Sequence, residues 1–169
     1  MRKFLAYFLG VLGIGCNAGV SVSPPTQITT DSALTVTCSP NPCNVHTHST
    51  VQEPPYPYMW YYRTDVKNTL DVPLRVVWFE AYHVENGKWI PGNVTGRTLT
   101  AKDFGEWYGD GDRIVDGVIP PRGTATDGRN WHGSMRPKSD PVKWAYKAID
   151  PSGVEHYAEV IVESVPIRK

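Results

Sequence analysis

The sequence predicts an all-β protein, an antiparallel immunoglobulin-like β-sandwich of about 6 to 8 strands with at most one short helix. Fifteen prolines and fifteen glycines interrupt the 169-residue chain, a density that disfavours long helices. The segments between them alternate apolar and polar side chains, which is the pattern of half-buried strands. Turn motifs recur about every 8 to 12 residues, as they do in sandwiches.

The segment YMWYYRTDVKN, residues 58–68, predicts a long strand. The face expected to point to the core holds every second side chain: Tyr58, Trp60, Tyr62, Thr64 and Val66. Met59 and Tyr61 share the other face with charged residues, so within this aromatic stretch only these two are candidates for exposure. A shorter strand is predicted upstream at SALTVTC, residues 32–38.

The next strand is predicted at PLRVVWFEAYHVE, residues 73–85, and is apolar on both faces at its middle. Asn86-Gly87 follows it and predicts a tight hairpin. The one short helix is expected after Thr100, because Thr100 suits the N-cap position and Asp103 stands three residues later.

The C-terminal third predicts four further strands. The first two are RIVDGVI, residues 113–119, and GTATDGRNW, residues 123–131, separated by a proline-rich turn. VKWAYKAI and VEHYAEVIVES, residues 142–149 and 154–164, form the clearest pair. Asp150-Pro-Ser-Gly between them has the composition of a type I turn.

The N-terminus predicts export. Residues 1–15 join a positive start to an apolar run too short to span a bilayer, which is typical of a signal peptide. LGIGC, ending at Cys16, is similar to the bacterial lipobox, so Cys16 is the predicted lipidation site and the lipid the predicted membrane anchor. Cleavage after Ala18 is the alternative. Residues 16–50, rich in Ser, Thr and Pro, then predict a tether to a domain at residues 51–169.

Composition excludes one class of partner and indicates no cofactor. Lysine plus arginine equals aspartate plus glutamate at 17 each, so the chain has no basic footprint for nucleic acid. No cofactor motif is recognised. A hydrolase with His132 as base and Ser134 as nucleophile lacks the G-x-S-x-G elbow around its serine, so we expect no enzymatic activity.

Cys38 and Cys43 frame a short loop, CSPNPC. An even pair of cysteines in an exported chain predicts a disulfide. His46 and His48 follow at a spacing of two, which places both on one face of a strand. Copper or zinc binding by these histidines with the two thiols is the alternative.

Two further sets of residues are candidate binding sites. Asp110, Asp112 and Asp116 lie in a glycine-rich segment and offer oxygen ligands for calcium, but the segment lacks the full EF-hand spacing, so a solvated hairpin tip is the favoured interpretation. The second set is the tryptophans expected at strand ends or in loops, which suit a sugar ring or a protein partner if exposed: Trp89, Trp107 and Trp131.

Residues 66–90 carry a family resemblance. This segment resembles the FxLYD-type modules of small bacterial envelope lipoproteins through Asn68, Pro73, Leu74, Phe79, Tyr82, Asn86 and Gly87. It has Ala81 where that pattern has leucine and His83 where it has aspartate. The resemblance implies an extracytoplasmic sandwich and brings no catalytic residue with it.

The expected function is therefore that of a non-enzymatic envelope lipoprotein, or secreted protein, that binds another envelope protein. Its expected location is the periplasm or the outer membrane. Carbohydrate binding through loop tryptophans and metal binding through His46 and His48 are the alternative functions.

Overall fold

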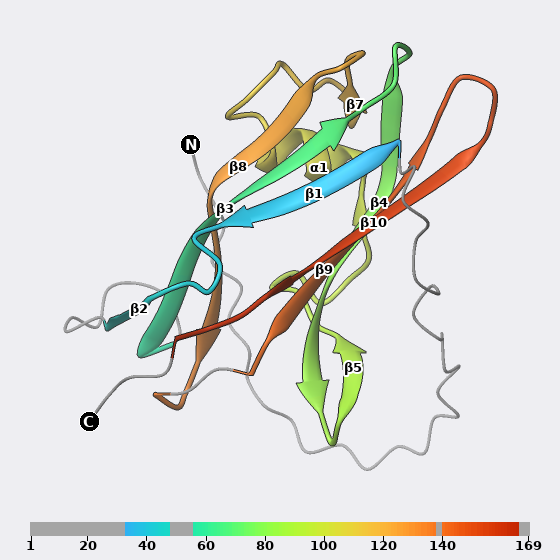
Figure 1. Ribbon diagram of the computed structural model, residues 1–169. Coiled ribbons are helices and arrows are strands. Elements are labelled where there is room, and N and C mark those ends of the chain that lie inside the picture. The colour runs from blue at the N-terminus through green and yellow to red at the C-terminus, as the bar shows by residue number, and fades with distance from the viewer. Residues whose placement is uncertain (1–32, 48–55, 138–139, 166–169) are drawn as a thin grey trace.

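The computed structural model describes residues 33–47, 56–137 and 140–165 (Figure 1). These residues form ten strands and one helix. The elements are β1 (Leu34–Ser39), β2 (Val45–Thr47), β3 (Tyr58–Asn68), β4 (Leu74–Glu85), β5 (Lys88–Pro91), β6 (Leu99–Thr100), α1 (Ala101–Trp107), β7 (Val118–Ile119), β8 (Thr124–Ser134), β9 (Val142–Ile149) and β10 (Glu155–Val162). The predicted signal and its cleavage sites, with Cys16 and Ala18, lie outside the described residues.

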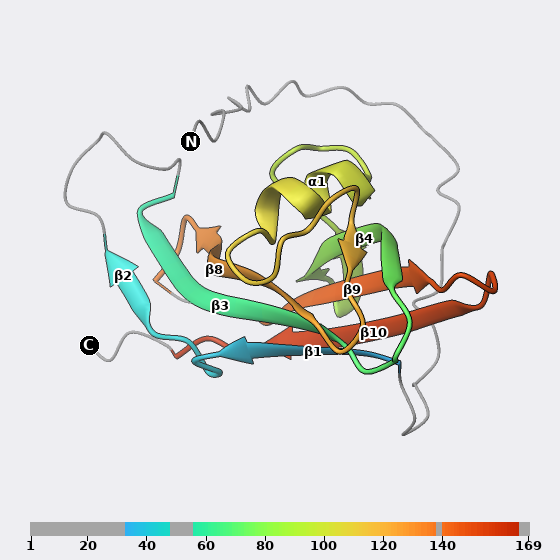
Figure 2. The same ribbon diagram turned by 90° about the horizontal axis from the view of Figure 1, so that it is seen from above.

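The strands form two antiparallel sheets that pack face to face (Figure 2). In the four-stranded sheet, β1 and β2 pair with one side of β3 and β8 pairs with the other. In the six-stranded sheet, the order is β10-β9-β4-β5, and β6 and β7 also pair with β4. The predicted β-sandwich is confirmed.

The core lies between the sheets and is rich in aromatic rings. Phe79 of β4 is its centre: its ring stacks on Tyr146 at a centroid distance of 6.0 Å and contacts Phe104 of α1 edge-on at 5.6 Å. Phe79, Phe104 and Tyr146 are all fully buried. Helix α1 thus fills the open side of the sandwich opposite β1 and β10 (Figure 2).

The start of α1 is held by the residues that predicted it. Asp103 accepts hydrogen bonds from the backbone N–H and the hydroxyl of Thr100, both at 2.8 Å. The Arg97 guanidinium donates two hydrogen bonds to the same carboxylate, at 2.6 and 2.8 Å. The N-cap prediction at Thr100 is confirmed.

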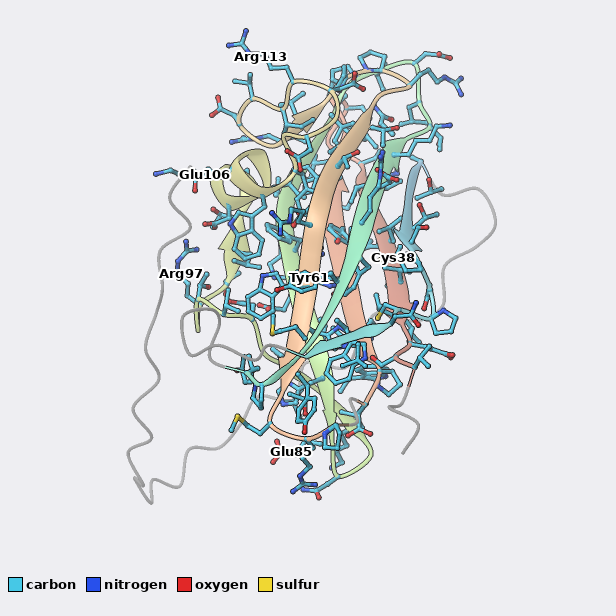
Figure 3. All side chains as sticks on the ribbon, turned by 90° about the vertical axis from the view of Figure 1, so that its left-hand side faces the viewer. Cys38, Tyr61, Glu85, Arg97, Glu106 and Arg113 are labelled. Carbon is cyan, nitrogen blue, oxygen red and sulfur yellow. The ribbon has the colours of Figure 1, made fainter. Side chains whose placement is uncertain are left out.

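Both predicted tight turns are present. Asn86 and Gly87 adopt positive φ angles of 51° and 74° between β4 and β5, as a type I′ hairpin requires. The β9–β10 turn closes with the Gly153 N–H donating to the Asp150 carbonyl at 3.0 Å. The hairpin at Glu85 and the loop at Arg113 lie at opposite ends of the sandwich (Figure 3).

The sandwich begins before residue 51, where the sequence placed the domain boundary. β1 pairs with β3 along six residues, and β2 continues that pairing. Beyond β1, Cys43 forms an isolated parallel β-bridge with Ser164, which follows β10. The side chain of Asn41 donates a hydrogen bond to the Ile161 carbonyl and accepts one from the Glu163 N–H. Residues 34–47 therefore belong to the folded domain, because β1 and β2 extend the four-stranded sheet and the loop between them bonds the end of β10 and the residues after it.

The aromatic strand β3 follows its predicted alternation with one difference. Trp60, Tyr62 and Val66 are buried among core residues, as expected. Met59 lies on the other face but is fully buried, so of the two candidates for exposure in the aromatic stretch only Tyr61 reaches the surface, half-buried. Among the described residues, no helix is long and apolar enough to cross a membrane.

Candidate functional site

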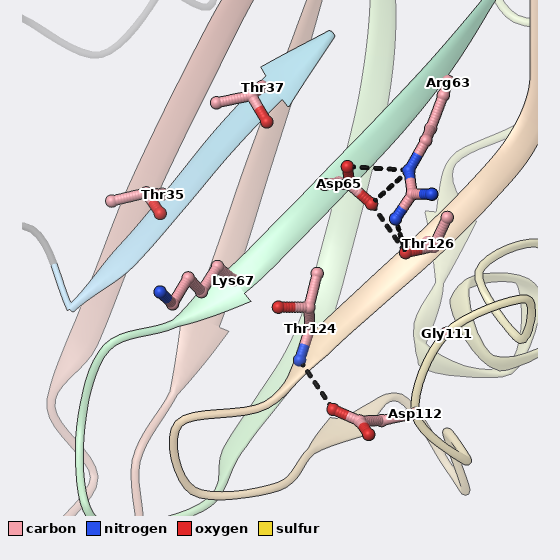
Figure 4. A pocket seen from close by; sticks show the side chains of 9 residues that line it. All are labelled: Thr35, Thr37, Arg63, Asp65, Lys67, Gly111, Asp112, Thr124 and Thr126. Atoms are coloured by element: carbon pink, nitrogen blue, oxygen red, sulfur yellow. Dashed lines mark hydrogen bonds and ion pairs between the residues drawn. The ribbon is translucent and has the colours of Figure 1, made fainter. Parts of the chain in front are cut away.

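The outer face of the four-stranded sheet carries a polar groove. Leu34, Val66 and Ala125 point into the core, so their neighbours along each strand point outward. Two rows cross the sheet, each a charged residue of β3 between two threonines: Thr35–Lys67–Thr124 and Thr37–Asp65–Thr126. With the adjoining loop they line a shallow pocket of about 520 Å³ (Figure 4).

Arg63 and Asp65 form the fixed centre of this groove. Arg63 Nε lies 2.9 and 2.8 Å from the two carboxylate oxygens of Asp65, and Thr126 donates to the same carboxylate at 2.6 Å. Partial burial raises the pKa of Asp65, but the bonds from Arg63 and Thr126 outweigh it and leave the pKa below its usual value. Asp65 is therefore a charged acceptor at neutral pH.

The wall of the groove is the loop that follows α1. Asp112 accepts the Thr124 N–H at 2.8 Å, and Asp110 accepts the Gly128 N–H at 3.1 Å. A Cβ on Gly111 would lie 2.7 Å from the Thr124 carbonyl oxygen, so only glycine lets the loop lie this close to β8.

The predicted calcium ligands act as loop anchors in this arrangement. Asp110 and Asp112 bond to β8 as described, whereas Asp116 lies in a separate turn at φ 50°, with its carbonyl accepting from Arg75 at 3.3 Å. The described residues contain no group of three or more acidic, histidine or cysteine side chains placed to hold a metal ion.

Toward the Tyr58 end of β3, the same outer face carries aromatic side chains next to the groove. Tyr61 of β3 lies directly opposite Trp131 of β8, and both are half-buried. The ring of Tyr56 lies 6.5 Å from that of Trp131 and occupies the space that a side chain on Gly133 would need. Tyr56, Tyr61 and Trp131 therefore extend the polar groove with an apolar surface.

The outer face of the six-stranded sheet carries a second aromatic cluster, here called the lysine–aromatic face. Lys143 is its buried centre: its Nζ lies 5.1 Å from the Tyr82 ring, 5.2 Å from the Trp89 ring and 3.3 Å from Glu159 Oε2. Lys147 lies 5.5 Å from the Tyr157 ring and pairs with Glu155. Lys147 also stands opposite Trp78 in the sheet, so Trp78 shares this face.

Glu80 and Asn93 border this face. Burial raises the pKa of Glu80, while the Asn93 amide, at 2.6 Å, and the Ala81 N–H, at 3.0 Å, lower it less. A carboxylate held at this depth is fixed in position by its two donors, and it supports the loop that follows β5.

The three predicted ligand-binding tryptophans do not share a surface. Trp89 belongs to the lysine–aromatic face and Trp131 to the other sheet. Trp107 turns toward the core and meets Phe79 edge-on at 5.5 Å. The phase of β3 indicated Tyr61 as an outward residue, and the phase of β4 could have indicated Trp78 and Tyr82, but strand phase could not place any of them relative to the predicted tryptophans.

Cys38 and Cys43 are free thiols, and the predicted disulfide is absent. The thiol of Cys38 shares a 3.5 Å hydrogen bond with Thr64, and Cys43 donates to the Glu163 carbonyl at 3.2 Å. Cys38 is thus held by β3, and Cys43 by the segment that follows β10. Burial raises the pKa of Cys38 to about 11 and also raises that of Cys43. His46 lies in β2, and His48 lies outside the described residues.

His132 is buried beside Trp60 and is not part of an exposed site. Its ring stacks on Trp60 at a centroid distance of 5.3 Å, and its Nε2 lies 2.9 Å from Ser164 Oγ. Its Nδ1 has no partner among the described residues. Burial lowers the pKa of His132 to about 4, so the ring is neutral at pH 7. Ser134 accepts the Arg136 N–H at 3.0 Å.

Neither family models nor curated proteins match the chain. Among solved structures it is similar to Northeast Structural Genomics Consortium target SoR45, at 14% identity and a TM-score of 0.45 over 78% of this chain and 86% of that one. It is also similar to the "Putative ApaA Protein from Bordetella pertussis", at 14% identity and a TM-score of 0.44 over 79% of this chain and 94% of that one. The β-sandwich assignment rests on the strand pairing described above.

Proposed function

We propose that the protein is a non-enzymatic, exported lipoprotein that binds another envelope protein through its lysine–aromatic face. The observation that carries this proposal is the position of Trp78, Tyr82, Trp89 and Tyr157 on one outer face, apart from the buried core. Tryptophan and tyrosine are the side chains that contribute most to protein–protein binding when a partner desolvates them.

The charges on this face favour a protein over a small molecule. The buried Lys143 pairs with Glu159 and the half-buried Lys147 pairs with Glu155, so this face is ordered and carries no net charge excess. A sheet face is broad and flat, whereas sites for small molecules are concave. Ordered side chains also lose little conformational entropy when a partner binds.

The test is photo-crosslinking of the full-length protein in its native envelope. A Trp89→Ala, Tyr157→Ala double variant should lose its main crosslinked partner, because both ring surfaces are removed. The matched control is Thr35→Ala, Thr124→Ala on the opposite face, which should crosslink as the unchanged protein does. Equal crosslinking by both double variants would contradict the assignment of this face.

The membrane anchor has a separate test. Export and lipidation are supported by the apolar start and by Cys16 after LGIG. Metabolic labelling with a fatty acid should mark the unchanged protein but not a Cys16→Ser variant. Absence of label on the unchanged protein would refute the lipid anchor and leave cleavage after Ala18.

A further inference from the structure

We propose that the outer face of the four-stranded sheet binds a neutral carbohydrate chain, with its sugar hydroxyls in the polar groove and one ring face on Tyr61 and Trp131. This site lies on the other sheet from the lysine–aromatic face and does not depend on the proposed protein partner. Three features of the groove favour such a ligand: its spare hydrogen-bonding groups, its balanced charge and the aromatic pair that continues it.

The spare hydrogen-bonding groups flank the central strand. Thr35 and Thr37 are exposed on β1, Thr124 is half-buried on β8, and Lys67 is exposed between them. The hydroxyls of these threonines and the ammonium of Lys67 make no bond within the described residues, so a ligand can use them. A threonine hydroxyl both donates and accepts, which matches the hydroxyl groups of a sugar.

The Arg63–Asp65 pair supplies fixed polar contacts. Asp65 is held in a fixed orientation by Arg63 and Thr126, and its carboxylate can still accept a hydrogen bond from a ligand. Arg63 has further N–H groups that the ion pair does not use. Neighbouring hydroxyls of a sugar fit such a pair because one donates to the carboxylate while the next accepts from the guanidinium. Charged partners strengthen both bonds.

The charges of the groove favour a neutral ligand. Arg63 and Lys67 are balanced by Asp65 and Asp112, all four of which line the same pocket (Figure 4). An anion such as phosphate needs an excess of donors and positive charge, and here it would approach two carboxylates. A polyhydroxylated neutral molecule meets donors and acceptors in equal measure.

The aromatic pair gives the groove its apolar end. Tyr61 and Trp131 are cross-strand neighbours on the same face as Lys67. The C–H face of a pyranose ring packs on an aromatic ring while its hydroxyls point outward to polar groups. From Tyr61 to Lys67 is six residues along β3, or about 20 Å at the rise of a strand. That length suits several linked sugars instead of one.

The test measures binding of the purified full-length protein to a glycan array, followed by calorimetry with cellohexaose, maltohexaose and chitohexaose as neutral probes. We expect at least one neutral oligosaccharide to bind. Trp131→Ala should weaken that binding at least 10-fold, whereas Trp89→Ala on the opposite sheet should leave it unchanged.

A second variant guards against loss of folding. Thr37→Ala alters only an exposed side chain and should weaken the same binding 2- to 5-fold or so with an unchanged unfolding midpoint, since one hydrogen bond is lost. Failure of every glycan to bind overturns the proposal. Binding of inorganic phosphate in place of the sugars, or sugar binding unaffected by Trp131→Ala, overturns it as well.

Discussion

Trp144 of β9 and Tyr62 of β3 join the two sheets through the core: the indole N–H donates a 2.9 Å hydrogen bond to the phenol oxygen. Both side chains are buried, Trp144 at 4% exposure and Tyr62 at 2%. Burial raises the pKa of Tyr62 well above its usual value, so its hydroxyl stays protonated and available as an acceptor. A buried polar bond of this kind fixes how the sheets are aligned.

Tyr62→Phe should destabilise the protein by about 1–3 kcal/mol, because it leaves the Trp144 N–H buried without an acceptor. Urea unfolding followed by tryptophan fluorescence measures the change. Tyr58→Phe is the matched control on the same strand, since the Tyr58 hydroxyl makes no hydrogen bond within the described residues, and its effect should stay below about 0.5 kcal/mol. Equal losses from both variants would show that the bond contributes little.

His132 should make stability depend on pH between about 6.5 and 4. Its pKa is lowered to about 4 in the folded protein, against about 6.5 in an unfolded chain, so the unfolded state binds the proton first. The contribution of His132 to the free energy of unfolding is fully present above pH 6.5. This contribution declines as the pH falls toward 4, by about 3 kcal/mol at most.

The measurement is urea unfolding at pH 7 and pH 4.5 for the unchanged protein and for His132→Gln. The variant lacks the titrating ring, so it should lose less stability between these two pH values than the unchanged protein. Identical losses would mean that the ring is protonated without penalty in the folded state.

Asp103→Asn should destabilise α1 and the loop before it by about 1–2 kcal/mol, because an amide cannot accept the bonds from Arg97 and Thr100 equally well. The bonds from Arg97, then those from Thr100, hold the Asp103 pKa far below its usual value despite burial. This contribution is present above about pH 4, the unfolded pKa, and is lost as the pH falls below it. Thermal unfolding checks the effect.

The control for this prediction is Lys102→Ala. Lys102 forms an exposed pair with Glu106 at 4.0 Å on the same helix, and such pairs contribute little. Its unfolding temperature should stay close to that of the unchanged protein. A loss as large as that of Asp103→Asn would show that the exposed Lys102–Glu106 pair stabilises α1 as much as its capped first turn does.

Cys38 and Cys43 should both react as free thiols after unfolding. In a Cys16→Ser background, alkylation in guanidinium without reductant should add two groups by mass spectrometry. In the folded protein the reaction should be slow, because burial raises both pKa values and the thiolate is the reacting form. Two groups added only after reduction would instead establish the disulfide.

The sequence predicted local features wherever neighbouring residues decide them. The alternation in β3 predicted that Trp60 and Val66 are buried, and Asn86-Gly87 predicted its hairpin, because side-chain direction and turn geometry depend on a few consecutive residues. It left Met59 as a candidate for exposure, but Met59 is fully buried.

Contacts between distant residues could not be predicted in this way. The thiol of Cys43 was assigned to Cys38 five positions away, but it bonds Glu163, 120 positions away. Sequence proximity made Ser134 the only candidate partner for His132 in the hydrolase that the sequence disfavours, whereas the His132 Nε2 lies 2.9 Å from Ser164 Oγ. Both partners come from the segment after β10, whose position depends on how the two sheets close.

The sequence by itself determined the fold class, the phase of the long strands, the short helix and its cap, since each follows from local backbone preferences and apolar periodicity. Only the tertiary structure decided which outward side chains share a surface. It separated Trp89, Trp107 and Trp131, and it brought Thr35, Lys67 and Thr124 into one row. The physical reason is that strand register and sheet packing join residues through hydrogen bonds whose partners are set by the whole chain.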